Sequence, residues 1–226
     1  MIDNQNRIVP DIFDTVVRTA EQSRGRADRF KSWEHCYTAF QSEIDEDHCA
    51  LHLGFYLASW GMYRGSTFLL QKDYTIHIPI VRLLKAAKYL GLKGAAPEVL
   101  KAEIQLIAQL CERVRDTYSN ELKRSLASDV SEHPIATKTL ISKVLLGTLG
   151  CIPAFDRFLL DGAAAVDCKL GELNRNNILK CLRFYSDNEA SFAKAESKLK
   201  DLGLVFPPMK LLDMKWTPEI GPDVKV

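Results

Sequence analysis

The chain has 226 residues, of which 46% are hydrophobic and 26% are charged, and its formal net charge is +1. These values are ordinary for a globular protein and exclude a disordered chain. No stretch approaches the roughly eighteen uninterrupted apolar residues that a bilayer-spanning helix needs, and the first residues have neither a basic start nor an apolar run. We therefore expect a cytoplasmic protein with no membrane attachment.

Charge distribution and cysteine spacing narrow the functional classes further. Residues 1–60 contain six Lys and Arg against ten Asp and Glu, whereas residues 77–158 contain twelve against eight. An excess of four positive charges is small for a dedicated nucleic-acid binder and also fits the solvated faces of ordinary helices. The six cysteines are scattered and include no CxxC pair, which favours buried thiols over a zinc or iron–sulfur site.

Apolar residues recur with helical period along the first half of the chain, and no convincing strand pattern is present. Pro10 can occupy the first position of a helix, and Asp47 is expected to cap another. Asp73 or Thr75 is expected to cap a fourth helix, in which Pro79 permits a kink or a late start. The helices predicted in this half span residues 10–23, 27–44, 48–62 and 74–90.

The longest predicted helix spans residues 97–126 and follows the linker GLKGAAP. Its apolar residues fall at spacings of three and four, so they form one buried stripe on a helix about 45 Å long. After a break at 128–134, helices are predicted over 135–150, 153–163, 173–186, 188–203 and 207–216, followed by an irregular tail at 217–226. The sequence predicts a single all-α domain, with lobes 1–92 and 97–216 around the long helix.

An aspartate interrupts an apolar run in the stretch GTLGCIPAFDRFLLDG. Pro153 at the first helical position, with Asp156 three residues later, is a favourable helix start, because proline presets φ and a carboxylate interacts with the unpaired amides of the first turn. In this interpretation Asp156 only stabilises the helix. A second interpretation gives the carboxylate a role in a reaction, and it depends on the residues that precede it.

From Lys138 the chain reads KTLISKVLLGTLGCIPAFDRFL, which resembles the helix-hairpin-helix DNA glycosylases, where K-T-A-x-x-V-L-x-x-A-F-G leads to P-V-D-T-H-V. The matching residues are Lys138, Thr139, Val144, Leu145, Gly150 and Asp156. The eighteen-residue step from Lys138 to Asp156 equals the family's step between its catalytic lysine and aspartate. The resemblance implies that Lys138 attacks the sugar C1′ and that Asp156 assists it. The family's glycine-rich hairpin corresponds here to SEHPIAT, which has no glycine.

A looser resemblance links ISKVLLGTLGCIPAFDRFL with the later PPMKLLDMKW. Both stretches are similar to uncharacterised bacterial helical proteins, in which an S-K-x-L-L helix precedes a P-x-x-D turn and a final helix contains D-M-x-x-W. In that alignment the notable lysine is Lys143 rather than Lys138. The resemblance implies a compact all-helical fold and no particular activity. The choice between the two lysines stays open at this stage.

The stretch SWGMYRGSTFLLQKD places aromatic residues beside an arginine and two glycines. Arg64 suits phosphate contact, and Trp60 and Tyr63 suit stacking on bases. The other interpretation is a tight corner between helices, with both aromatic residues in the core and Arg64 tied to a carboxylate. His48 and His52 lie four residues apart on one helix face, but without a third ligand we expect no metal there, and His52 is expected to face the core.

Three functional hypotheses follow. The first is a nucleic-acid enzyme related to those glycosylases. Its catalytic residues would be Lys138 or Lys143 with Asp156, converging on a cleft, and Arg64, Lys143 and Arg157 would contact phosphate. The second is a non-catalytic protein whose basic middle third binds nucleic acid or an acidic partner. The third is a helical module that forms a homo-oligomer. No P-loop, dinucleotide or nucleophile-elbow motif is present, so we expect no cofactor.

Overall fold

A computed structural model of the chain describes residues 11–23, 25–65, 67–125 and 135–217. These residues form helices and no strand, which confirms the all-α class. The helices are α1 (Ile12–Gln22), α2 (Phe30–Gln41), α3 (Glu46–Ser59), η1 (Phe68–Gln71), η2 (Tyr74–His77), α4 (Ile78–Leu84), η3 (Ala87–Leu92), α5 (Pro97–Ala102), α6 (Ile104–Ser125), α7 (Lys138–Thr148), α8 (Arg157–Ala164), α9 (Arg175–Asp187), α10 (Glu189–Asp201) and α11 (Pro208–Trp216). Of the helices in this part of the chain, none is long and apolar enough to cross a membrane.

Short polar side chains begin many of these helices. Each accepts a hydrogen bond from a backbone N–H two or three residues later, which satisfies one of the free donors of the first turn. These residues are Asp11, Asp45, Asp73, Thr137, Asp156 and Asn174. The predicted cap Asp73 is confirmed, whereas the prediction of Asp47 is wrong, because Asp45 caps α3 and Asp47 lies in its first turn. Pro10, the break at 128–134, most of SEHPIAT and nearly all of the tail lie outside the described residues.

Two predicted helices are divided in the structure. The helix expected over 97–126 is broken at Glu103, whose φ of −91° and ψ of 15° are not helical, and both resulting pieces, α5 and α6, pack against α9. The helix expected over 74–90 becomes η2, α4 and η3. Pro79 lies in the first turn of α4, because it has no N–H and its ring would clash with a preceding helical turn.

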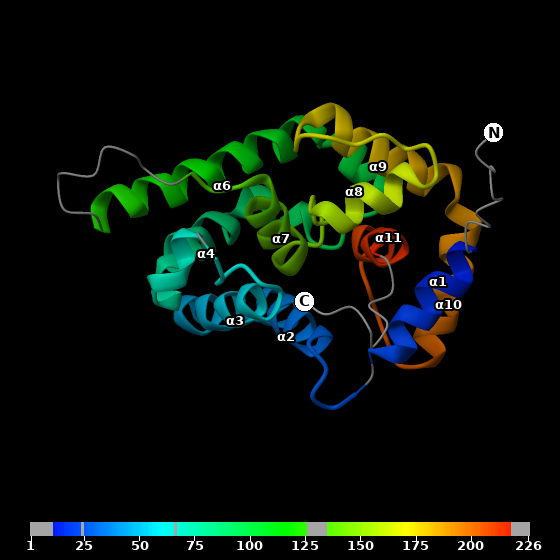
Figure 1. Cartoon of the computed structure of the whole chain (residues 1–226), viewed down its shortest axis with the longest axis horizontal. Coiled ribbons are helices and arrows are strands. Elements are labelled where there is room, and N and C mark those ends of the chain that lie inside the picture. Colours follow the sequence, from blue (N-terminus) through cyan, green and yellow to red (C-terminus); the bar gives the residue numbers. More distant parts are fainter. Residues whose placement is uncertain (1–10, 24, 66, 126–134, 218–226) are drawn as a thin grey trace, which may run out of the picture.

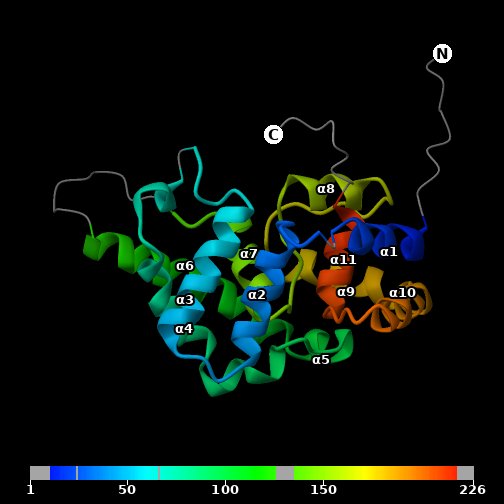
Figure 2. The ribbon, with the colours of Figure 1, turned by 90° about the horizontal axis from the view of Figure 1, so that it is seen from below.

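Two helices, α7 and α11, lie in the interior of the molecule. Figures 1 and 2 show α7 between the α2–α3 pair and α6, and α11 between α8, α9 and the α1–α10 pair. All residues of α7 from Leu140 to Thr148, and all of α11 from Met209 to Trp216, are buried. Both segments contain lysine, and α11 also contains an aspartate, so the fold places side chains of these types in its interior. The candidate site is built around these residues.

A buried histidine connects the turn after α3 to α6. His77 is fully buried, and its Nε2 and Nδ1 lie 2.8 Å from the hydroxyls of Tyr63 and Tyr118, respectively. Burial lowers the pKa of His77 to about 3, so its ring is neutral in the folded protein near pH 7. The two hydrogen bonds hold Tyr63, and with it the residues that follow α3, against the core.

His77 gives the protein an acid sensitivity that can be measured. The unfolded chain protonates this histidine near its usual pKa of about 6.5, so its contribution to stability is complete above that pH and is lost as the pH falls toward about 3. We expect the free energy of unfolding to fall by roughly 1 kcal/mol per pH unit more steeply in the wild type than in His77→Gln between pH 6 and 4. Urea titrations at several pH values measure both slopes, and equal slopes would contradict the prediction.

Candidate functional site

A cavity of about 750 Å³ lies between the end of α3, one face of α7, the start of α8, and α11. Its charged lining residues are Arg29, Arg64, Lys143, Asp156, Arg157, Lys210 and Asp213, and its aromatic ones are Tyr56, Trp60, Tyr63 and Phe158. Five cations and two carboxylates give this lining a formal charge of 5 − 2 = +3. The volume lies within the range of about 300–1,000 Å³ that is typical of ligand sites. The charge favours an anionic ligand.

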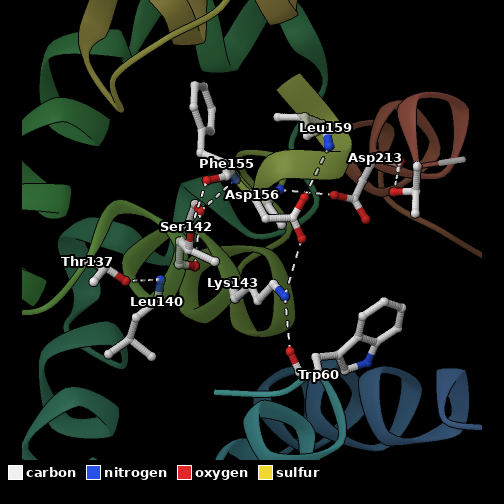
Figure 3. A network of polar contacts seen from close by, with 12 residues as sticks. Trp60, Thr137, Leu140, Ser142, Lys143, Phe155, Asp156, Leu159 and Asp213 are labelled. Carbon is white, nitrogen blue, oxygen red and sulfur yellow. Dashed lines mark hydrogen bonds and ion pairs between the residues drawn. The ribbon is translucent and has the colours of Figure 1, made fainter. Parts of the chain in front are cut away.

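Lys143 and Asp156 form an ion pair in the wall of this cavity. The Lys143 Nζ lies 3.3 Å from Oδ2 of Asp156 and 3.1 Å from the backbone oxygen of Trp60, as Figure 3 shows. The exposed fractions of the two side chains are 8% and 20%, so the amine is nearly withdrawn from water. The other carboxylate oxygen of Asp156 accepts from the Leu159 N–H at 3.1 Å. Asp156 therefore caps α8 and also faces a lysine. The expected helix start at Pro153 is wrong, because α8 begins at Arg157 and the Asp156 side chain accepts from its first turn.

The segment before Asp156 is held by side chains from two helices. The Ala154 N–H donates to Oδ1 of Asp213 at 3.0 Å, and the Phe155 N–H donates to the Ser142 hydroxyl at 2.7 Å. The Thr139 hydroxyl donates to the Phe155 carbonyl at 3.1 Å. Because α7 and α11 both bind this segment, the position of the Asp156 carboxylate is fixed by the interior of the fold rather than by a free loop.

A second lysine–aspartate pair lies in the same cavity. The Lys210 Nζ is 3.0 Å from Oδ2 of Asp213, and only 2% of the lysine side chain is exposed. The ammonium also lies 5.3, 5.4 and 5.2 Å from the ring centroids of Phe30, Trp33 and Trp60. Contacts at these distances are cation–π interactions. Sequence reasoning gave neither residue a role, although the stretch PPMKLLDMKW contains both.

The structure does not bring Lys138 to Asp156. Its Nζ lies 3.0 Å from Oε1 of Glu172 and 3.2 Å from the Gly171 carbonyl, and it does not line the cavity. Lys138 and Lys143 are five residues apart on α7, which places them about 140° apart around the helix axis. The expected convergence of Lys138 and Asp156 is therefore wrong, and Lys143 is the lysine beside the carboxylate.

The residues proposed to contact nucleic acid all line this cavity, in two different settings; they are Trp60, Tyr63, Arg64, Lys143 and Arg157. Trp60 lies inside, with its ring centroid 5.9 Å from the Lys143 ammonium. Arg64 and Arg157 are exposed, and neither forms an ion pair with a carboxylate in the described ranges. Gly61 has a φ of +77°, and a Cβ there would lie 2.9 Å from Nε of Arg64, so the arginine folds back over the turn.

Two tyrosines of the lining are neutral at pH 7. Tyr56 is buried, and burial raises the pKa of its hydroxyl well above the usual range, an effect that the negative charge of Asp213 increases. Burial raises the pKa of Tyr63 to about 12, with a further contribution from Asp73. Both are therefore hydrogen-bonding groups, and they leave the net charge of the lining unchanged.

Arg29 is a cavity residue that sequence reasoning missed. It precedes α2, and its guanidinium carbon lies 4.6 Å from the centroid of the Trp60 ring. Burial lowers the pKa of this guanidinium, although Asp28 opposes the effect. The sequence could have indicated this position. Two consecutive helices joined by a short loop pack antiparallel, so Arg29 at the start of α2 lies near the end of α3.

The predicted histidine pair lies away from this cavity. The exposed His48 ring contacts the Asp45 carboxylate at 2.6 Å, and His52 is only partly buried, with its ring 6.3 Å from that of His35. The expectation that His52 faces the core is therefore wrong, because the inner face of α3 is filled by apolar residues such as Leu53. In the described segments, no three His, Cys, Asp or Glu side chains are grouped as a metal site requires.

No family model, curated protein or solved structure matches this chain. The residues of the cavity are therefore the basis for a functional proposal.

Proposed function

We propose that this protein is a nucleic-acid enzyme of the DNA glycosylase or lyase type, in which Lys143 attacks the C1′ atom of a sugar held in the cavity. The main support is the nearly buried Lys143–Asp156 pair in the wall of a cationic cavity. The resemblance to the glycosylases implied an amine beside this aspartate, and Lys143 supplies it in place of Lys138. The second resemblance pointed to the same lysine.

The geometry is suited to amine catalysis. An ammonium must lose a proton before it can attack, and Oδ2 of Asp156, 3.3 Å away, can accept that proton. At an abasic sugar, whose open form has an aldehyde at C1′, the neutral amine adds to the carbon. The hydroxyl of the adduct then takes the proton held by Asp156 and leaves as water, which gives a protonated imine and restores the carboxylate. The Asp156 carboxylate then lies beside the protonated imine and stabilises its positive charge.

The remaining lining residues fit a nucleotide that has left a base stack. Enzymes that act on one nucleotide turn it out of the duplex into a pocket with aromatic walls. The exposed Arg64 and Arg157 lie at the cavity and can contact the adjoining backbone phosphates, which position a nucleic acid without reading its sequence. Binding is therefore expected to weaken as the salt concentration rises.

Borohydride trapping on a duplex with an abasic site tests this proposal, because borohydride reduces an imine to a stable covalent adduct. We expect the wild type to give an adduct and Lys143→Ala to give none. Lys138→Ala is the matched control, since it removes the same charge from the same helix outside the cavity, and we expect it to retain the adduct. No adduct with the wild type, or an undiminished adduct with Lys143→Ala, would overturn the proposal.

Asp156→Asn separates the two roles of the carboxylate. Asparagine is as good a helix cap as aspartate, so we expect α8 to persist. The melting temperature is expected to fall, because the nearly buried Lys143 ammonium loses its carboxylate partner. Loss of the proton acceptor is expected to slow adduct formation by about 100-fold, as is typical for general acid–base groups. An unchanged rate would leave Asp156 as a cap only.

The same cavity supports one alternative, a non-catalytic protein that binds nucleic acid. The net charge of +3 attracts an anion whether or not Lys143 reacts. This alternative is supported if no adduct forms while salt-sensitive binding survives in Asp156→Asn.

We also propose a cytoplasmic location. All six cysteines are free thiols, and all but Cys168 are buried. Free cysteines are typical of reducing compartments.

A further inference from the structure

The anion subsite of this cavity points to a narrower class of substrate, and this inference deepens the proposed function and rests on it. We propose that the cavity binds a terminal phosphate, a phosphomonoester, through the guanidinium of Arg29. The substrate would then be a sugar at a phosphorylated nucleic-acid end, or a nucleotide, rather than an internal residue of a continuous strand.

Arg29 is positioned to bind a phosphate group in the cavity. Its guanidinium carbon lies over the Trp60 ring, 4.6 Å from the ring centroid. A planar guanidinium carries its N–H donors at its edge, where phosphate oxygens can accept from them. The neighbouring Asp28 forms no ion pair with Arg29 in the described residues, and its carboxylate accepts from the Phe30 N–H at 2.9 Å. The N–H donors of Arg29 are therefore not taken up by this carboxylate, although its negative charge opposes the lowering of the Arg29 pKa. A guanidinium offers paired donors that match phosphate oxygens.

The charge count favours a dianion over a monoanion. Both carboxylates of the lining are already paired with a lysine, Asp156 with Lys143 and Asp213 with Lys210. The remaining cations are Arg29, Arg64 and Arg157. An internal phosphodiester has one negative charge, whereas a phosphomonoester has about −1.5 to −2 near pH 7. A phosphomonoester therefore neutralises more of the +3 charge, which matters most at the half-buried Arg29.

The three arginines of the cavity differ in their exposure to solvent. Arg64 and Arg157 are exposed, Arg29 is partly buried, and the Lys143 ammonium lies on the same indole ring as Arg29. An anion attracted by the exposed arginines therefore meets Arg29 close to the reactive amine. A terminal phosphate and C1′ belong to the same nucleotide, so one residue of substrate can occupy both subsites.

Fluorescence anisotropy with duplexes ending in a stable tetrahydrofuran analogue of an abasic sugar tests this inference. Two labelled duplexes differ only in a 5′-phosphate or a 5′-hydroxyl on that analogue, and a third has the analogue at an internal position. We expect the 5′-phosphate duplex to bind at least about tenfold more tightly than both others at one fixed salt concentration. Equal affinities would overturn the inference.

Variants assign the preference to Arg29. Arg29→Met is expected to abolish the preference for the 5′-phosphate, measured as the ratio of the affinities of the 5′-phosphate and 5′-hydroxyl duplexes, while the lost charge weakens both duplexes alike. Arg113→Met is the matched control, because Arg113 is exposed on α6 and does not line the cavity. Arg29→Lys keeps the charge without the paired donors and is expected to retain a reduced preference for the 5′-phosphate. This variant also tests the assignment if Arg29→Met fails to fold. Equal losses in Arg29→Met and Arg113→Met would overturn the assignment.

Two further measurements separate the possibilities. A nucleoside 5′-monophosphate that displaces the duplex more strongly than the nucleoside supports the phosphate site and identifies a free nucleotide as its source, whereas equal displacement contradicts the site. A 5′-phosphate preference without any borohydride adduct would support the phosphate site and overturn the amine chemistry. An adduct that forms equally at internal and 5′-phosphorylated abasic sites would support the amine chemistry and overturn the phosphate site.

Discussion

Replacing Asp213 with alanine is expected to lower the free energy of unfolding by about 3–5 kcal/mol. The change leaves the Lys210 ammonium, whose side chain is 2% exposed, without its only carboxylate partner in the described residues. It also removes the acceptor of the Ala154 N–H. The penalty is large because a buried charge that loses its partner keeps its desolvation cost. Urea unfolding measures the loss as a change of midpoint at constant slope.

Two controls distinguish this mechanism from the general loss of a carboxylate. Asp161→Ala removes an exposed carboxylate from α8 and is expected to change stability by no more than about 0.5 kcal/mol. The double variant Lys210→Met, Asp213→Leu removes both charges and is expected to recover more than half of the loss, since apolar replacements of buried ion pairs are often tolerated. A loss below about 1 kcal/mol in Asp213→Ala would contradict a buried, uncompensated Lys210.

Gly162→Ala is expected to destabilise the protein by about 3 kcal/mol, the upper part of the usual range for overpacking. A Cβ at this position would lie 2.0 Å from the backbone oxygen of Trp216 and 2.7 Å from its carbonyl carbon. These are backbone atoms, so relief requires α8 to move away from α11. Helix propensity alone would make the same change favourable by about 1 kcal/mol, so the sign of the result shows which effect dominates.

Gly91→Ala is the matched control for this variant. A Cβ at Gly91 meets no heavy atom within 4 Å, and its φ is not in the left-handed region. We expect Gly91→Ala to leave stability unchanged or to raise it by less than about 1 kcal/mol. Thermal unfolding of both variants in the same buffer makes the comparison, and similar losses at the two positions would refute the close packing of α8 on α11.

Local sequence rules predicted much of the helical architecture but not the partner of Asp156. Caps such as Asp73 depend on neighbouring residues, so they can be recognised in the sequence. The step from Lys138 to Asp156 is a distance along the chain, and it does not say which side of α7 faces the Asp156 carboxylate. Residues four apart share one face of a helix, and Thr139 and Lys143 line the cavity together. Helix geometry therefore identifies the face of α7 that lines the cavity, whereas the spacing along the chain does not.

Long-range packing explains why the second ion pair was not predicted. Lys210 is a lysine in a short amphipathic segment, and such residues usually face solvent. Its burial depends on aromatic residues of α2 and on Trp60 after α3, which contact α11 only in the folded protein. Periodicity identifies the apolar face of a helix but does not identify the helix that covers it.

Because α11 forms one wall of the cavity, the cavity is completed late in the synthesis of the chain. Chains fold from the N-terminal side during synthesis, and Lys143 and Asp156 leave the ribosome before Lys210 and Asp213. Until α11 docks, the amide of Ala154 lacks its acceptor, and the cavity lacks one wall. A nascent chain therefore contains the lysine and the aspartate without the pocket that surrounds them, and the cavity is complete only after α11 has been translated.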